Sequence, residues 1–126
     1  MEKQIINTNS APAPIGPYNQ AVLANNTLYI SGQICLEAQS GNLKNRDLQE
    51  ETHQVMQNLR VILQEAGMTF ANVVKATIFI TDMSRFGEIN EIYAKYFSGD
   101  FPARETVQVA ALPRMVNVEI SMIATK

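Results

Sequence analysis

The order of helical and strand-like apolar patterns constrains this chain more than any other feature. Apolar residues recur at helical spacing over residues 47–66, and again from Asp82 or Ser84 to about Phe97. Two helices can cover only one face of a sheet. The order β β β α β α β β therefore predicts one α+β domain over residues 1–126, a two-layer sandwich with a mixed sheet and both helices on one face. The strands that each helix joins are expected to pair in parallel. Strand patterns occupy residues 3–6, 18–24, 27–33, 72–81, 104–110 and 115–124.

The first helix carries its own start and stop signals. Asp47 is a good N-cap, and Gly67 suits the left-handed position after the last turn. His53 lies well off the apolar face, so it is predicted to be exposed to solvent and not to be catalytic. Asn25-Asn26, between two strand patterns, predicts a tight hairpin. The apolar face of this helix consists of Leu48, Thr52, Val55, Leu59, Ile62, Leu63 and Ala66.

Charge and composition argue against several classes of function. The formal net charge is −2, the sequence pI is about 5.3, and the Lys and Arg residues are scattered, so no nucleic-acid partner is expected. His53 is the sole histidine and Cys35 the sole cysteine, so no metal site is expected and no intrachain disulfide can form. No apolar run approaches the roughly 20 residues that span a bilayer. These features predict a cytoplasmic protein without a membrane partner.

Strand periodicity assigns side chains to the two faces of the sheet. Arg104, Thr106 and Glu119 lack the core parity, so Arg104 and Glu119 are predicted to share the helix-free face. Phe79 and Ile123 are placed there too, which makes this face a candidate for burial in an oligomer. The pattern leaves two interpretations open: solvated charges in an ion pair worth roughly 0–1 kcal/mol, or the anchors of a site. The core parity is assigned to Val74, Ala76, Ile78, Ile80, Val107, Val109, Val116, Val118, Ile120 and Met122.

Asn90 lies within the apolar stripe of the second helix. An unpaired amide in that position would be costly. Asn90 is therefore expected to hydrogen-bond a nearby backbone group, a ligand or a neighbouring subunit. The stripe itself consists of Phe86, Ile89, Tyr93 and Phe97.

Five stretches of the chain carry a family resemblance. They are "IGPYNQA" at 15–21, "LYISGQI" at 28–34, "VVKATIFITDMSRFGEINEIYAKYF" at 73–97, "FPARETVQVAALP" at 101–113 and "VEISMIA" at 118–124. Together they cover essentially the whole chain, in order, and resemble the RidA/YjgF family of reactive intermediate imine deaminases. The resemblance implies a chorismate-mutase-like fold and a homotrimer whose sheets surround a central β-barrel. Sites would then lie in clefts between adjacent subunits.

The resemblance also implies an activity that needs no cofactor. Family members hydrolyse 2-imino acids such as 2-iminobutanoate and 2-iminopropanoate to 2-oxo acids and ammonia. The imines arise from enamines that pyridoxal-phosphate-dependent dehydratases release. Arg104 matches the arginine that holds the substrate carboxylate, a task suited to a planar guanidinium. Glu119 matches the glutamate that activates the attacking water. The other cleft positions match Tyr18, Ser31, Gly32 and Thr106 and, from a neighbouring subunit, Phe86 and Asn90.

Some of these matches have a structural alternative. Tyr18 could pack its own loop, and Ser31-Gly32 could serve a close backbone approach. Thr106 stands where several members have cysteine, and Cys35 stands where proline is usual; Cys35 is interpreted as structural. Two other functions stay open. One is a non-catalytic trimer that binds small 2-oxo or amino acids as a sensor, and the other is a chaperone-like interaction protein.

Overall fold

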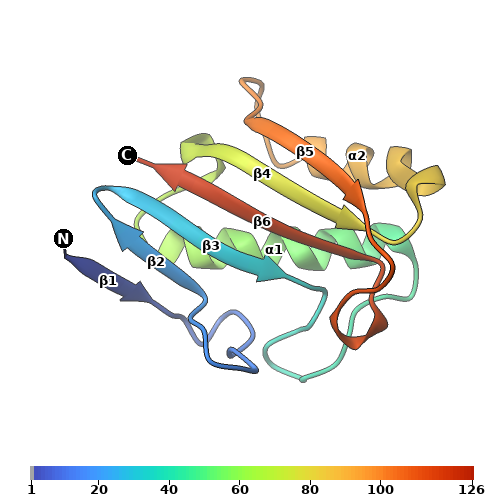
Figure 1. Ribbon diagram of the computed structural model, residues 1–126, viewed down its shortest axis with the longest axis horizontal. Helices are drawn as coiled ribbons and strands as arrows, with labels where there is room; N and C mark the ends of the chain where they lie inside the picture. Colours follow the sequence, from blue (N-terminus) through green and yellow to red (C-terminus); the bar gives the residue numbers. More distant parts are fainter. Residues whose placement is uncertain (1) are drawn as a thin grey trace.

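A single mixed sheet organises the computed structural model, which describes residues 2–126 (Figure 1). Within these residues the sheet has six strands in the order β1-β2-β3-β6-β4-β5. β4 and β5 pair in parallel, and all other neighbouring strands are antiparallel. The strands are β1 (Lys3–Ile6), β2 (Ala21–Ala24), β3 (Thr27–Gln33), β4 (Val73–Ile80), β5 (Ala103–Gln108) and β6 (Val118–Thr125).

Both helices lie on the same side of the sheet, behind it in Figure 1. α1 (Leu48–Glu65) packs against β3 and β6, and α2 (Phe86–Ala94) packs against α1. The predicted α+β sandwich with its helices on one face is therefore confirmed. Neither helix of the described chain is long and apolar enough to cross a lipid bilayer. Three short 3-10 turns complete the described residues: η1 (Phe70–Asn72), η2 (Met83–Arg85) and η3 (Pro113–Met115).

The last strand of the chain lies in the interior of the sheet. β6 pairs antiparallel with both β3 and β4. β3 and β4, which α1 connects, therefore point the same way without being neighbours. The predicted parallel pairing is confirmed for β4 with β5 and is wrong for β3 with β4. This insertion places Glu119, near the start of β6, beside Phe79 of β4 and next to the end of β3.

The local signals around α1 and the hairpin are confirmed. The Asp47 side chain accepts a hydrogen bond from the backbone N–H of Glu50 at 2.8 Å, as an N-cap should. Gly67 follows the helix with φ of 72°. Asn25 and Asn26 have φ of 51° and 64°, the two positive values that a type I′ hairpin turn needs.

The core lies between the sheet and the helices and includes the whole predicted apolar face of α1. The predicted exposure of His53 and the predicted burial of Val74 are wrong. The His53 ring is half-buried and its Nδ1 lies 2.8 Å from Tyr96 Oη, because the chain after α2 folds back over α1. Val74 is 47% exposed, because a register shift between Val73 and Lys75 turns Val73 into the core in its place.

Three predicted boundaries are also wrong, and the first is the start of β2, which lies at Ala21 and not at residue 18. α2 ends at Ala94, short of the expected Phe97. β6 begins at Val118 and not at residue 115. Arg114 and Met115 have φ of 56° and 57°, and residues in the left-handed region cannot continue a strand.

Candidate active site

Arg104 and Glu119 lie on opposite faces of the sheet. In β5, Arg104 is in register with Ala76 of β4, which is fully buried under the helices. In β6, Glu119 is in register with Phe79 of β4, which has the other parity. In-register residues of neighbouring strands point to the same side of a sheet. Arg104 therefore faces the helix layer and Glu119 faces away from it, so the prediction that they share the helix-free face is wrong.

The error comes from the position of β5 at the edge of the sheet. The sequence pattern assigned Val107 to the core because it is apolar. In the structure Val107 is in register with Phe79 on the helix-free face and is 42% exposed. Thr106, in register with the buried Ile78, points toward the helices together with Arg104. On this strand Arg104, Thr106 and Gln108 face the helix layer, whereas Val107 faces away from it, so hydrophobicity alone selects the wrong face.

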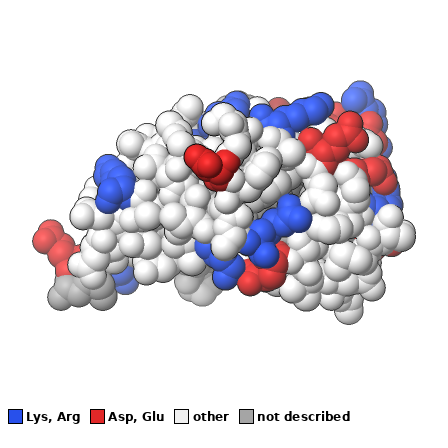
Figure 2. Space-filling model, turned by 90° about the horizontal axis from the view of Figure 1, so that it is seen from above, with Lys and Arg blue, Asp and Glu red and all other residues white. Residues whose placement is uncertain are grey.

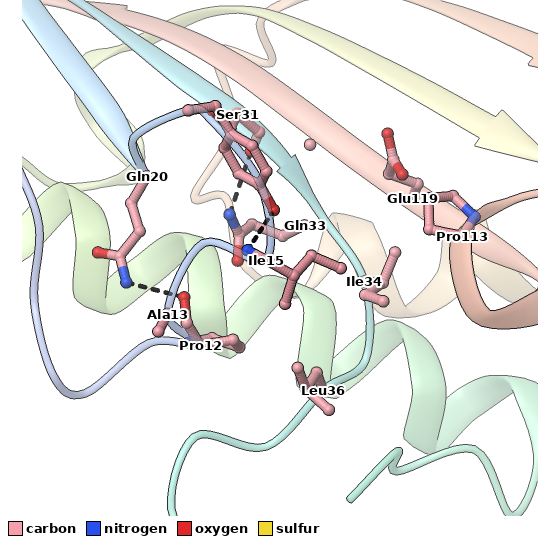
Figure 3. A pocket seen from close by; sticks show the side chains of 12 residues that line it. Pro12, Ala13, Ile15, Gln20, Ser31, Gln33, Ile34, Leu36, Pro113 and Glu119 are labelled. Atoms are coloured by element: carbon pink, nitrogen blue, oxygen red, sulfur yellow. Dashed lines mark hydrogen bonds between the residues drawn. The ribbon is translucent and has the colours of Figure 1, made fainter. Parts of the chain in front are cut away.

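Glu119 lies in a pocket of about 360 Å³ on the other side, which we call the Glu119 pocket. Its walls come from residues 12–20, residues 31–36, Pro113 and Glu119. Figure 3 shows Glu119 and Pro113 on one side of the pocket, with Ile34 and Leu36 on another. Three segments that are distant in sequence therefore meet here: the loop before β2, the end of β3 with its continuation, and the turn that leads into β6.

Gly32 allows the Glu119 carboxylate to lie directly against β3. The register of β3 on β6 is irregular between Ile30 and Gln33, where Gly32 lies. A Cβ atom on residue 32 would stand 2.8 Å from Cδ and 3.0 Å from Cγ of Glu119. Carbon atoms pack at roughly 3.5–4.0 Å, so any larger residue would displace the glutamate. A close approach at Gly32 was expected to involve another segment of backbone, but the group that lies against Gly32 is the Glu119 side chain.

The Glu119 carboxyl group is half-buried without an offsetting partner. Burial raises its pKa and is the only cause of the shift. None of the ion pairs within residues 2–126 includes it. A raised pKa makes the ionised carboxylate a stronger base than an exposed glutamate. This arrangement suits a group that takes a proton from water and later returns it.

Tyr18 and Ser31 contribute to the same pocket in different ways. The Tyr18 side chain is 46% exposed, and its hydroxyl oxygen accepts a hydrogen bond of 3.4 Å from the backbone N–H of Ile15. The Ser31 hydroxyl donates to the backbone carbonyl of Asn19 at 2.6 Å. Ser31 therefore helps to hold the loop before β2, while the Tyr18 ring stays open to a ligand.

The remaining candidates form a second group on the helix side, which we call the Arg104 corner. It consists of Phe86, Asn90 and Tyr93 of α2 with Arg104 and Thr106 of β5. The spacing of the three α2 residues places them on one helix face. The Arg104 guanidinium carbon lies 5.2 Å from the ring centroid of Phe86 and 5.0 Å from that of Tyr93, within cation–π range. No ion pair of the described chain uses Arg104.

Three buried polar atoms without a hydrogen-bond partner lie in this corner. They are Asn90 Oδ1, Tyr93 Oη and Thr106 Oγ1, and residues 2–126 contain no other such side-chain atom. Asn90 was expected to hydrogen-bond a nearby backbone group, but within residues 2–126 its side-chain oxygen has no such partner. Burial raises the pKa of Tyr93, although the nearby Arg104 opposes the shift. Buried polar atoms are normally paired, so the corner has more hydrogen-bonding capacity than one chain uses.

Sequence reasoning missed part of both groups. Tyr93 was assigned to the core as one more member of the apolar stripe, although its position three residues after Asn90 could have marked it. The contribution of residues 12–15 to the Glu119 pocket has no local signal, because side chains far along the sequence hold that loop in place. Pro113 likewise lies in the pocket because the backbone turns at Arg114, where φ is positive, and no sequence pattern predicts this turn.

Comparisons with known proteins agree with this architecture. The family model described as Endoribonuclease L-PSP matches residues 8–126. The mouse (Mus musculus) protein named 2-iminobutanoate/2-iminopropanoate deaminase is 51% identical over 124 residues, which cover 98% of this chain and 92% of the relative.

Solved structures show the same similarity in three dimensions. The Escherichia coli YjgF gene product matches with a TM-score of 0.93 at 36% identity, over 98% of both chains. E. coli TdcF, solved with bound serine, matches with a TM-score of 0.94 at 38% identity, again over 98% of both chains. Since the family model and the relatives each extend over nearly the whole sequence, the chain belongs to the RidA/YjgF family, whose model carries the description Endoribonuclease L-PSP.

Proposed function

We propose that the protein is a deaminase that hydrolyses reactive 2-imino acids, such as 2-iminobutanoate and 2-iminopropanoate, to 2-oxo acids and ammonia. The observation that carries the proposal is the Glu119 carboxylate, which is half-buried, unpaired and set against Gly32 in a pocket. The 51% identity to a mouse protein with the corresponding name supports the substrate class. Enamines released by pyridoxal-phosphate-dependent dehydratases would supply the imines.

The reaction needs a base and a water molecule, because a protonated imine is already electrophilic. Glu119 takes a proton from the water as its oxygen bonds to the imine carbon, which gives a neutral carbinolamine. Protonated Glu119 then returns the proton to the nitrogen, and the C–N bond breaks. The hydroxyl proton passes to the departing ammonia, so that a 2-oxo acid and ammonium are formed. General-base help of this kind contributes about 10²–10⁴-fold.

Arg104 provides the anchor for the substrate carboxylate in this proposal. Its guanidinium group stacks over Phe86 and Tyr93 and has no carboxylate partner within the described chain. A bidentate pair with the substrate would use the free N–H donors. Asn90 and Thr106, whose side-chain oxygens also lack partners, would hydrogen-bond the substrate at the same wall.

One chain cannot place Arg104 and Glu119 around one substrate, because the two side chains project from opposite faces of its sheet. The site would therefore form between subunits, with the Arg104 corner of one facing the Glu119 pocket of the next. A homotrimer whose helix-free faces meet in a central β-barrel satisfies this requirement. It would also cover the apolar residues of that face, which a monomer leaves in contact with water. These residues are Tyr29, Phe79, Val107 and Ile123.

RNA is not the substrate in this proposal, in spite of the description of the family model. On the face seen in Figure 2, Lys and Arg side chains lie next to Asp and Glu, and wide areas are uncharged. The chain carries a formal net charge of −2. A phosphate backbone requires a continuous basic surface, and neither observation supports one.

A second candidate function is the binding of small 2-oxo or amino acids without catalysis. The relative TdcF, which was solved with bound serine, favours this alternative. The same inter-subunit cleft would then act as a sensor, with Arg104 holding the ligand carboxylate.

Production of 2-iminobutanoate in situ separates the two functions. A threonine dehydratase generates the enamine, and the rate of 2-oxobutanoate formation is followed with and without the protein. The deaminase is expected to accelerate hydrolysis, and Glu119→Gln is expected to slow it. Saturable binding of 2-oxobutanoate without any acceleration would establish the binding function instead. Analytical ultracentrifugation tests the assembly, and a monomer at the assay concentration would contradict a site between subunits.

A further inference from the structure

Three of the buried polar side chains in this protein are directed at the backbone around the Glu119 pocket. Burying a polar group is unfavourable unless it is hydrogen-bonded, so the partners of such groups are informative. Gln20, Glu51 and Asn58 are each at most 2% exposed. Each hydrogen-bonds backbone groups of a different segment that forms or delivers a wall of the pocket.

Glu51 on α1 holds the start of β6. Its Oε2 accepts hydrogen bonds from the backbone N–H groups of Asn117 at 2.7 Å and Val118 at 3.1 Å. Its Oε1 accepts a third from the Asn117 side-chain amide at 2.8 Å. These bonds fix the chain immediately before Glu119. They also fix the far end of the turn that brings Pro113 into the pocket.

Asn58, two turns further along α1, holds the wall that continues from β3. Its side-chain amide donates to the backbone carbonyl of Ile34 at 3.0 Å and to that of Leu36 at 2.9 Å. Both residues line the pocket, below Glu119 and Pro113 in the view of Figure 3. One amide group therefore sets the position of this whole wall.

Gln20 holds the third wall, the loop before β2. Its amide group donates to the backbone carbonyls of Pro12 at 2.9 Å, Thr8 at 3.0 Å and Ala11 at 3.3 Å. Its Oε1 accepts a hydrogen bond of 2.7 Å from the backbone N–H of Thr8. The bond to Pro12 is drawn in Figure 3. Residues 12 and 13 line the pocket as a result.

We propose that Glu51, Asn58 and Gln20 are positioning residues that hold the three walls of the Glu119 pocket in register. Among the three, Glu51 is expected to have the largest effect on the position of the Glu119 carboxylate. Its three hydrogen bonds go to Asn117 and Val118, the two residues that precede Glu119. The kinetic consequence rests on the proposed deaminase function. Since the Arg104 corner makes none of these bonds, loosening a wall lowers kcat and leaves KM nearly unchanged.

The test compares Glu51→Gln with Thr52→Val. Glu51→Gln keeps the shape of the side chain but removes the negative charge that the three donors share, and its N–H group replaces the oxygen that faces the Asn117 side-chain amide. Thr52 is the next residue, is 0% exposed, and donates its hydroxyl only to the Leu48 carbonyl of its own helix at 2.8 Å. Both variants lose buried hydrogen bonds, but only Glu51→Gln affects the pocket. Asn117→Ala, which removes one of the three bonds to Glu51, provides a graded intermediate.

We expect Glu51→Gln to lower kcat by about 10–100-fold, since a misplacement of 1 Å can cost about 10²-fold. KM should change by less than about threefold. Thr52→Val should keep kcat within about twofold at a temperature where both variants are fully folded, and Asn117→Ala should fall between them. Equal kcat values for Glu51→Gln and Thr52→Val would overturn the proposal.

Hydrogen–deuterium exchange supplies a readout that does not depend on activity. Glu51→Gln is expected to speed amide exchange in residues 113–119 by about tenfold or more, and Thr52→Val is not. If wild type fails to hydrolyse 2-iminobutanoate, the deaminase function fails, and the exchange result still decides whether Glu51 holds this wall. Unchanged exchange in residues 113–119 would refute the positioning role.

Discussion

Two arginines in this molecule are held in the same way but lie in opposite surroundings. Arg60 of α1 places its guanidinium carbon 5.7 Å from the ring centroid of Phe70 and 4.9 Å from that of Tyr96. Arg104 of β5 lies at 5.2 Å and 5.0 Å from the rings of Phe86 and Tyr93. Neither arginine forms an ion pair within residues 2–126.

The polar atoms around them distinguish the two corners. The Tyr96 hydroxyl accepts a hydrogen bond from the Gln57 side chain at 3.2 Å and lies 2.8 Å from His53 Nδ1. The Tyr93 hydroxyl has no partner in the described chain, and neither have the oxygens of Asn90 and Thr106 beside it. The hydroxyl beside Arg60 is hydrogen-bonded within one chain, whereas the Arg104 corner keeps three buried polar atoms unpaired within residues 2–126. Stacking on two aromatic rings is therefore common to both arginines, and the unpaired buried polar atoms are what distinguish Arg104.

Removal of the two guanidinium groups should give the largest contrast. Arg104→Ala is expected to reduce kcat/KM for 2-iminobutanoate by about 10–100-fold or more, since hydrogen bonds to charged groups contribute about 1.5–3 kcal/mol. Arg60→Ala should leave kcat/KM within about twofold. The coupled dehydratase assay measures both, and sedimentation checks that each variant keeps the assembly of wild type. Equal losses in the two variants would break the distinction between the corners.

The Glu119 pocket, the other half of the proposed site, can be altered by a substitution at Gly32. Gly32→Ala places a Cβ 2.8 Å from Cδ of Glu119, so the carboxylate must move and kcat should fall about tenfold or more. Gly87→Ala is the matched control beside the Arg104 corner. Apart from its chain neighbours and the adjacent helix backbone, nothing lies within 4 Å of its added Cβ, and alanine favours a helix by roughly 0.5–1 kcal/mol. An active Gly32→Ala enzyme would remove Glu119 from the mechanism.

A pH profile tests which half of the site titrates. Burial raises the pKa of Glu119, so activity should fall about tenfold per pH unit as pH drops below that pKa and the base is lost. Glu119→Gln should remove this acid limb along with most of the activity. If the activity of Glu119→Gln falls over the same acidic pH range as that of wild type, the titrating group is not Glu119.

Ionisation of Glu119 should lower the stability of the fold, although the same ionisation is needed for activity. A carboxyl group whose pKa is raised by folding disfavours the folded state when it ionises. The penalty is absent below the pKa of the unfolded chain and complete above the raised pKa of the folded one. Glu119→Gln is therefore expected to increase the free energy of unfolding at neutral pH but not at acidic pH. Urea titrations at the two pH values measure the difference.

The smallest expected effect concerns the two tyrosine hydroxyls. Tyr96→Phe removes a hydroxyl bonded to His53 and Gln57 and should destabilise the protein by about 0.5–1.5 kcal/mol. Tyr93→Phe removes a hydroxyl that lacks partners within one chain, so the isolated fold should lose less stability than in Tyr96→Phe. Chemical denaturation of both variants checks the order. A larger loss for Tyr93→Phe would show that its hydroxyl is paired in the assembled protein.

Most of the fold follows from sequence patterns, and the resemblance names part of the Glu119 pocket and part of the Arg104 corner. The caps of α1 at Asp47 and Gly67 are predicted correctly because they depend on adjacent residues. Tyr18, Ser31 and Gly32 do meet Glu119 in one pocket. What escapes prediction is the turn at Arg114 and the insertion of β6 between β3 and β4, since neither depends on local periodicity.

The chain's own order of residues determines which segments become helices and strands, and which side chains alternate. Periodicity and capping act over a few neighbouring residues, so they can be read locally. Tertiary structure alone decides that Arg104 and Glu119 face opposite sides. The alternation in β5 allows either face, and only its pairing with β4 at the edge of the sheet selects one. The same holds for the pKa of Glu119, because the burial that raises it comes from segments far apart in the sequence.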